Sequence, residues 1–152
     1  MWAVAGVLLI LLIWPAFQPG SSPEHRLHIG TLSNFKQVAT SVRLYMIDND
    51  ERFPPQFSTQ EDLRDALASY ELPELVYKTT NPNGGKMMPN SELAGIKLSA
   101  VLDPAETAMI YETKDWPDGK VVIAAVDTST RFVDSRDLIN LDPGTIEFAT
   151  ID

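Results

Sequence analysis

The chain has 152 residues and no cysteine, and its 12 lysines and arginines against 21 aspartates and glutamates give a net charge of −9 at pH 7. Such an acidic chain lacks the clustered basic side chains that neutralise phosphates, so we expect no nucleic-acid partner. The absence of cysteine excludes a disulfide scaffold, a zinc site with cysteine ligands and thiol catalysis. The length and the apolar content of 44% suit one compact domain.

The N-terminal sequence is almost entirely apolar. Residues 1–17 are apolar apart from one glycine and one proline, and no charged residue occurs before Glu24. As a helix, residues 2–17 would extend about 24 Å, near the lower limit for crossing a hydrocarbon core of about 30 Å. We therefore predict a transmembrane anchor at 1–17 that contacts the lipid bilayer through residues 2–17, followed by a linker at 18–23. A cleaved signal peptide and a buried helix of a soluble protein are the alternatives.

Charge alone gives conflicting evidence on the orientation of this anchor. The nearest basic residues, Arg26 and Lys36, follow the apolar run, and the positive-inside rule would place that flank in the cytoplasm. The lack of cysteine favours neither compartment. The choice of compartment therefore rests on the resemblance given below.

The first element predicted after the linker is a long amphipathic helix from Glu24 to about Asn49. Its apolar residues recur at spacings of three and four, which places them on one stripe. Pro54 and Pro55 prevent the helix from continuing. The stripe consists of Leu32, Phe35, Val38, Ala39, Val42, Tyr45 and Met46.

A second, shorter helix is predicted to start at Ser58. Ser58 and Glu61 have the spacing of a capping box, in which the serine oxygen and the glutamate cap free backbone N–H groups. Pro73 would end this helix. Residues 79–92 are rich in asparagine, proline and glycine and are predicted to form a loop with several turns.

The C-terminal third favours β-strands that are joined by short turns. Three segments are rich in strand-forming residues: 107–113, 120–126 and 131–134. Their short connections predict antiparallel pairing, and residues 75–78 are a candidate edge strand. The predicted fold class is therefore α+β, with an N-terminal transmembrane helix followed by an amphipathic helix packed on a small antiparallel sheet of three to four strands. The α+β domain would occupy residues 24–152.

Motifs that carry chemistry are weak throughout the sequence. His25 and His28 are three residues apart, but two ligands do not make a structural metal site. Residues 48–51 (DNDE) resemble the start of a calcium loop, yet the residues that follow do not supply the glycine and the glutamate that such a loop requires. Residues 83–86 (NGGK) lack the spacing of a phosphate-binding loop.

Two further features are possible sites. Carboxylates in predicted loops are calcium candidates if they converge: Asp115, Asp118, Asp134, Asp137 and Asp142. Trp116 either is exposed for recognition or covers the edge of a core, which is the commoner role. Since no acid, base or nucleophile can be placed together, we predict no catalytic residue, no metal site, no cofactor and no enzyme activity.

The order of several motifs resembles that of the pilin-like and pseudopilin-like proteins of bacteria. An apolar run ending in 14–17 (WPAF) precedes 32–37 (LSNFKQ), 45–50 (YMIDND) and 52–55 (RFPP). In that family an apolar helix with a proline step is followed by L-S-N-x-K-Q, Y-x-x-D-x-D and F-P-P in the same order. The similarity covers most of residues 14–134, while the basic leader and the G-F-T-L-I-E processing site usual in the family do not occur.

The resemblance implies a single-pass protein of the cell membrane with an extracytoplasmic C-terminal domain. Its function would be that of a structural or assembly subunit of a bacterial envelope or type II secretion apparatus, with itself or other pilin-like subunits as partners. A membrane-anchored module that binds an extracytoplasmic ligand or partner is the alternative. Solvent-facing aromatic residues around Trp116 would favour the binding module, and a continuous apolar stripe over residues 2–47 would favour assembly between helices.

Overall fold

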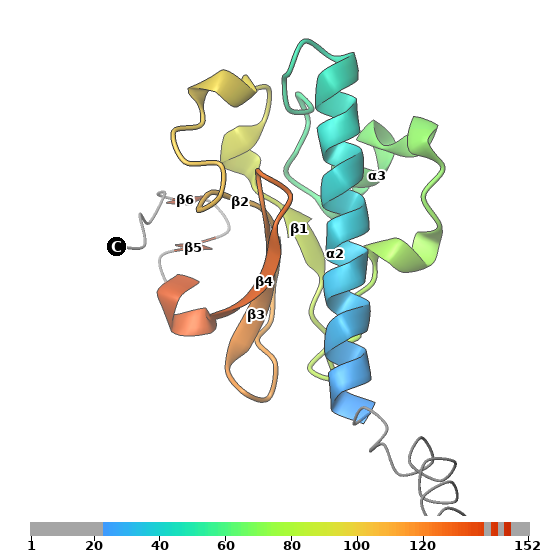
Figure 1. The fold of residues 1–152 in the computed structure, drawn as a ribbon, viewed down its shortest axis with the longest axis vertical. Coiled ribbons are helices and arrows are strands. Elements are labelled where there is room, and N and C mark those ends of the chain that lie inside the picture. Colours follow the sequence, from blue (N-terminus) through green and yellow to red (C-terminus); the bar gives the residue numbers. More distant parts are fainter. Residues whose placement is uncertain (1–22, 139–140, 143–144, 147–152) are drawn as a thin grey trace, which may run out of the picture.

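The computed structural model describes residues 23–138, 141–142 and 145–146. Within them a long helix, α2, lies against a four-stranded antiparallel sheet with the strand order β1-β2-β3-β4 (Figure 1). The helices and strands are α2 (Pro23–Asp48), α3 (Gln60–Ala66), β1 (Met87–Pro89), β2 (Ala108–Glu112), β3 (Lys120–Ala125), β4 (Thr130–Asp134), β5 (Leu141–Asp142) and β6 (Thr145–Ile146). The short 3-10 helices are η2 (Ala68–Tyr70), η3 (Glu74–Tyr77), η4 (Ser91–Leu93), η5 (Leu98–Ala100) and η6 (Ser135–Leu138).

Helix α2 confirms the predicted amphipathic helix to within one residue at each end. Phe35, Val38 and Val42 from the predicted stripe are fully buried and belong to the core shared with the sheet. On another side of α2 the segment around η3 runs along the helix, where Asn34 Nδ2 donates to the carbonyl oxygen of Lys78 at 2.9 Å. The helix is therefore held between the sheet and the η3 segment (Figure 1).

The core lies mainly between α2 and one face of the sheet. Side chains alternate between the two faces of a strand, so Val122 of β3 faces the α2 side, while Ile123 faces the other side and pairs in register with Tyr111. Glu112 and Phe132 are the register neighbours of Met87 and Val122 respectively. These four residues form one row across the sheet, and the carboxyl group of Glu112 therefore lies among apolar side chains.

The predicted fold class needs one correction, which concerns the transmembrane helix. Nowhere in the described chain is there a helix both long and apolar enough to cross a membrane. Helix α2 has 26 residues, but charged side chains such as Glu24, Arg26 and Lys36 interrupt its apolar character. The predicted anchor at 1–17 and all but the last residue of the linker at 18–23 lie outside the described residues. The fold class is accordingly α+β with a four-stranded antiparallel sheet, and no transmembrane helix is assigned.

The second helix begins later than predicted. Thr59, and not Ser58, is the N-cap: its hydroxyl accepts a hydrogen bond from the backbone N–H of Asp62, whose carboxylate accepts from the N–H of Thr59. The capping box therefore uses the neighbouring pair of residues at the same spacing. The α-helical part ends at Ala66, and the 3-10 turn η2 follows.

Two predictions for the segment before the sheet are wrong. Residues 75–78 are not an edge strand, since Glu74–Tyr77 form the 3-10 helix η3 directly after Pro73. The edge strand is instead β1, which lies inside the segment predicted as a loop and pairs with β2. Its three residues end in Pro89, a residue that is tolerated at a sheet edge because it needs no partner for an N–H group.

Candidate functional site

A surface groove with a volume of about 520 Å³ lies between α2, the chain that follows it, and α3. Helix α2 contributes Tyr45, and the other lining residues are Pro54, Pro55, Gln56, Asp62, Asp65 and Ala66. Flat aromatic and proline surfaces therefore stand beside two carboxylates. A groove of this kind offers both apolar contact area and negative charge to a bound group.

The carboxylates of the groove are fixed by the start of α3. Asp62 Oδ2 accepts hydrogen bonds from the backbone N–H groups of Ser58 at 3.0 Å and Thr59 at 2.8 Å. These bonds lower the pKa of Asp62 and keep its carboxylate ionised. Asp65 lies one turn further along α3 and is exposed. The groove thus carries negative charge at neutral pH.

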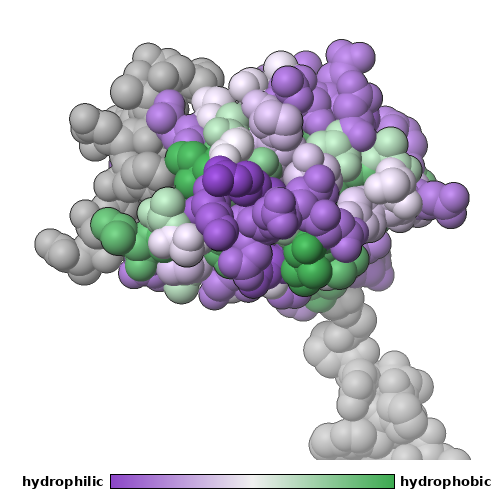
Figure 2. Space-filling model, turned by 90° about the horizontal axis from the view of Figure 1, so that it is seen from above, coloured by the Kyte–Doolittle hydropathy of each residue, from purple (hydrophilic) through white to green (hydrophobic). Residues whose placement is uncertain are grey.

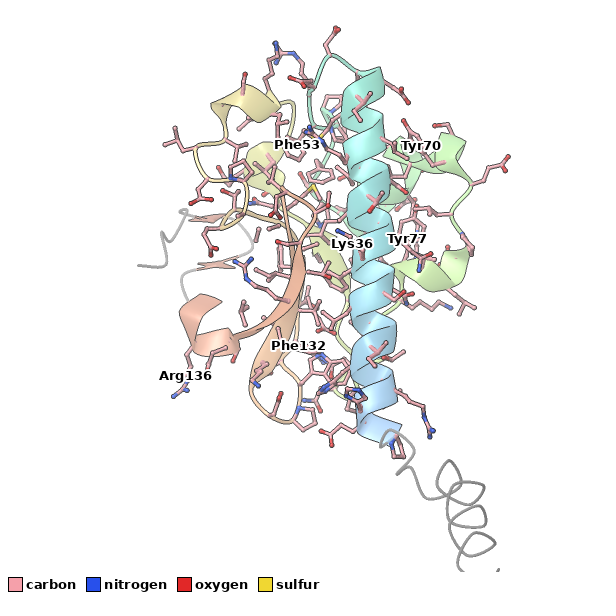
Figure 3. All side chains as sticks on the ribbon, viewed as in Figure 1. Lys36, Phe53, Tyr70, Tyr77, Phe132 and Arg136 are labelled. Atoms are coloured by element: carbon pink, nitrogen blue, oxygen red, sulfur yellow. The ribbon has the colours of Figure 1, made fainter. Side chains whose placement is uncertain are left out.

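The end of α2 adds to this negative charge. A helix C-terminus carries a partial negative charge that basic residues normally offset, but the last turn of α2 contains none and the helix ends at Asp48. Tyr70 in η2 donates its hydroxyl hydrogen to Asp48 Oδ2 at 2.6 Å, and this bond raises the pKa of Tyr70 to about 12. Figure 3 shows Tyr70 and Tyr77 on the side of α2 that α3 covers, and Phe132 on the sheet side.

The surrounding surface is mostly polar. Figure 2 views the molecule from the end where α2 finishes, and hydrophilic residues cover most of this end, with separate hydrophobic patches between them. Two of the exposed apolar side chains belong to the last turns of α2, Leu44 and Ile47, which are 45% and 61% exposed. The groove therefore suits a cationic side chain with an aliphatic stem better than a wholly apolar ligand.

The structure does not bring the two histidines together as a metal site. The His28 ring packs edge-on against Trp116 with centroids 4.4 Å apart and against Phe132 at 4.7 Å. His25 is exposed on the first turns of α2. In the part of the chain that is described, no three histidine, aspartate or glutamate side chains are grouped so that they could hold a metal ion.

The acidic residues weighed as calcium ligands are dispersed. Asp48 is the last residue of α2 and residues 49–51 form the turn after it, where Asp50 and Glu51 take left-handed backbone angles. Asp118 and Asp134 each face a basic neighbour, at 3.6 Å from Lys120 and at 2.8 Å from Arg136 respectively. The exposed Asp115 uses its backbone carbonyl as the acceptor for Asn83 Nδ2, and the side chains of Asp137 and Asp142 lie outside the described part.

Two predicted features of the strand connections are confirmed. Residues 83–86 are a loop, with Gly84 at a φ of +75°. Trp116 begins the β2–β3 turn and is only 2% exposed, so it covers the core and is not a recognition aromatic on the surface. Gly119 closes this turn with a φ of +77°, and its N–H donates to the carbonyl oxygen of Trp116 at 2.8 Å.

The sequence did not single out Tyr45 as a groove residue or Glu112 as a buried acid. Tyr45 falls on the apolar stripe of α2, where pattern alone predicts burial. Glu112 ends a strand of otherwise mostly apolar residues, two positions after Ile110. An acid on the same strand face as an apolar core residue was the available signal.

Comparisons with protein-family models, with curated proteins and with solved structures found no match to this chain. The pilin-like resemblance therefore stays a prediction that rests on the sequence motifs. The class that the structure itself defines is an α+β domain with one long helix on a four-stranded antiparallel sheet.

Proposed function

We propose that the chain is a pilin-like structural or assembly subunit of a bacterial envelope or secretion apparatus. Its described body would lie on the extracytoplasmic side of the cell membrane and work by contact, without turnover. The apolar sequence at residues 2–17 would attach it to the bilayer or to other subunits.

The observation that carries this proposal is the placement of α2. The helix begins at Pro23, a few residues after the apolar sequence, at one end of the body, and runs the length of the sheet (Figure 1). This long helix on an antiparallel sheet is the arrangement that the motif order predicts. The N-terminal sequence would then join the body at one end of the sheet, where α2 begins.

The exposed face of α2 limits where assembly contacts would form. Ile29 is 51% exposed, and Leu44 and Ile47 follow further along the helix. Between them the same face carries polar side chains such as Lys36 and Thr40. Within α2, then, the apolar stripe that would favour packing between helices is interrupted. Self-association would therefore depend on the residues before the helix.

Crosslinking within membranes tests the proposal. A photoreactive residue at Ala5 of the full-length chain should crosslink to a second copy or to another pilin-like subunit. The same residue at Thr40 on α2 serves as the control and should give far less product. A chain that stays monomeric in membranes and gives no crosslink from either position would contradict the assembly function.

The groove favours a second candidate, a module that binds a basic partner. Its two aspartates and the negative end of α2 would attract a lysine or arginine side chain, whose stem would pack on Tyr45 and Pro55. The affinity of the full-length chain for an arginine-containing peptide tests this second candidate function. Asp65→Asn should weaken it several-fold, since one charge contact is removed. Glu92→Asn, at an exposed acid on η4, is the matched control and should leave it unchanged.

A further inference from the structure

Glu112 holds a carboxyl group inside the core, at only 3% exposure. Its Oε2 atom accepts hydrogen bonds from Trp116 Nε1 at 2.7 Å and from the backbone N–H of Val122 at 3.3 Å. Its Oε1 atom is buried without a hydrogen-bond partner. Thr79 and Asn81 lie close enough to favour the charged form, but neither makes a hydrogen bond of good geometry to Oε1.

No cation compensates this carboxyl group in the described chain, where none of the ion pairs includes Glu112. Five elements surround it: the loop at 79–86, the turn at 113–119, and β1, β3 and α2. β1 presents the apolar Met87 to it. The charged and titratable residues that the other segments carry are Lys86 on the loop, Lys114, Asp115 and Asp118 on the turn, Lys120 on β3 and, where α2 meets Trp116, His28. All of these are exposed except His28, which packs against Trp116.

The ionised form of this group is unfavourable, because a buried charge without an oppositely charged partner loses its hydration and gains no ion pair in return. Burial raises the pKa of Glu112, and the hydrogen bond from Trp116 opposes that effect only in part. The protonated form therefore fits this environment better.

Glu112 lies where the loop and the turn meet. Asn81 Nδ2 donates to the carbonyl oxygen of Lys114, and Asn83 Nδ2 to that of Asp115, both at 2.8 Å. Gly85 also lies against Glu112, so closely that an added Cβ would be 2.8 Å from Oε1. The two connections are thus joined to each other and to this one carboxyl group.

We propose that Glu112 is a pH-sensitive switch: when protonated it holds the loop at 79–86 and the turn at 113–119 on the sheet, and when ionised it loosens them. Trp116 carries the change to the start of α2, because its ring packs against His28 and Phe132. The switch would therefore act at the end of the body that follows the apolar N-terminal sequence.

The direction of the pH dependence follows from proton linkage. The open form exposes Glu112, whose pKa then returns to its ordinary 4.5, while the closed form has a higher pKa. The closed form is favoured most below pH 4.5, and this preference is lost as the pH rises toward the pKa of the closed form. Over that interval the population of the open form rises about tenfold per pH unit and is constant above it.

Hydrogen exchange of the full-length chain tests the switch. Protection factors of amides in 79–86 and 113–119 should fall by up to about tenfold per pH unit within that interval, while amides in the middle of α2 keep theirs. Glu112→Gln, which keeps the shape without the charge, should remove the dependence. The matched control, Glu92→Gln on the surface, should retain it.

Two further measurements keep the proposal falsifiable if Glu112→Gln fails to fold. Carboxyl carbon NMR of the unmodified chain should show Glu112 titrating above 4.5, and a titration at or below this value overturns the proposal. His28→Gln should leave the pH dependence in place. If this variant abolishes it, or if Glu112→Gln folds and preserves it, Glu112 is not the switch.

Discussion

Lys36 of α2 donates from Nζ to the backbone carbonyl oxygen of Thr128 at 2.7 Å and to its hydroxyl oxygen at 3.0 Å. Thr128 lies in the β3–β4 turn with a φ of +70°, a left-handed angle that a β-branched residue rarely adopts. The contact joins helix and turn across 92 positions of sequence. A surface lysine thus stabilises a strained turn.

Relief of this strain should stabilise the protein. A non-glycine residue in the left-handed region costs about 1–2 kcal/mol, and glycine loses about 0.5–1 kcal/mol in extra chain entropy. Thr128→Gly should therefore raise the free energy of unfolding by about 0.5–1 kcal/mol, as measured by denaturant melts. Lys36→Met should lower it by about 1 kcal/mol. A destabilised Thr128→Gly variant would mean that the lysine contact to the hydroxyl outweighs the strain.

The buried face of α2 gives a second prediction. Phe35 is fully buried in the core, and Phe35→Ala should cost about 3–5 kcal/mol through lost burial and the cavity that remains. Thr40 is exposed, and its hydroxyl donates only to the carbonyl oxygen of Lys36 in the preceding turn. Thr40→Ala should change stability by less than about 0.5 kcal/mol. Similar losses for both variants would show that the buried face is misassigned.

The close contact between Gly85 and Glu112 gives a third prediction. Its added Cβ would lie 2.8 Å from Oε1 and 2.9 Å from Cγ of Glu112, a side chain that the core prevents from moving away. We expect Gly85→Ala to destabilise the protein by about 1–3 kcal/mol. Gly30 in α2 is the matched control, because its added Cβ would meet nothing closer than 3.9 Å. Gly30→Ala should stabilise by up to about 1 kcal/mol in thermal or denaturant melts.

The start of α3 gives a fourth prediction, which concerns both the stability of variants and its dependence on pH. Thr59→Ala should cost about 1 kcal/mol by removing the N-cap, whereas Ser58→Ala should cost far less. Folding lowers the pKa of Asp62 from 3.8, so its carboxylate stabilises the protein fully above that pH. This contribution is lost as the pH falls through the folded-state pKa. The stability difference between the native chain and Asp62→Asn should therefore shrink in acid, and a constant difference would contradict the cap.

Sequence reasoning succeeded where a pattern is long. Helix α2 repeats its apolar spacing over many turns, and this periodicity, together with Pro54 and Pro55 beyond its end, predicted its bounds to within a residue. The predicted N-cap of α3 is wrong by one position, because two pairs of residues have the spacing of a capping box: Ser58 with Glu61, and Thr59 with Asp62. Only the tertiary position of the chain selects between them.

The remaining differences arise where a segment is short. β1 has three residues and becomes a strand through pairing with β2, since its own sequence ends in Pro89. η3 contains strand-forming residues, yet it lies along α2 as a 3-10 helix. The groove could not be predicted for the same reason, because Tyr45 and Asp62 meet only through the path of the chain between α2 and α3.

The short β1 also affects how the sheet can grow. An exposed sheet edge attracts further strands and is a route to aggregation. β1 presents only three residues at its edge, and Pro89 has no N–H group to offer an incoming strand. The short length and Pro89 therefore protect this side of the sheet against edge-to-edge association, in addition to the contact that α3 makes with β1.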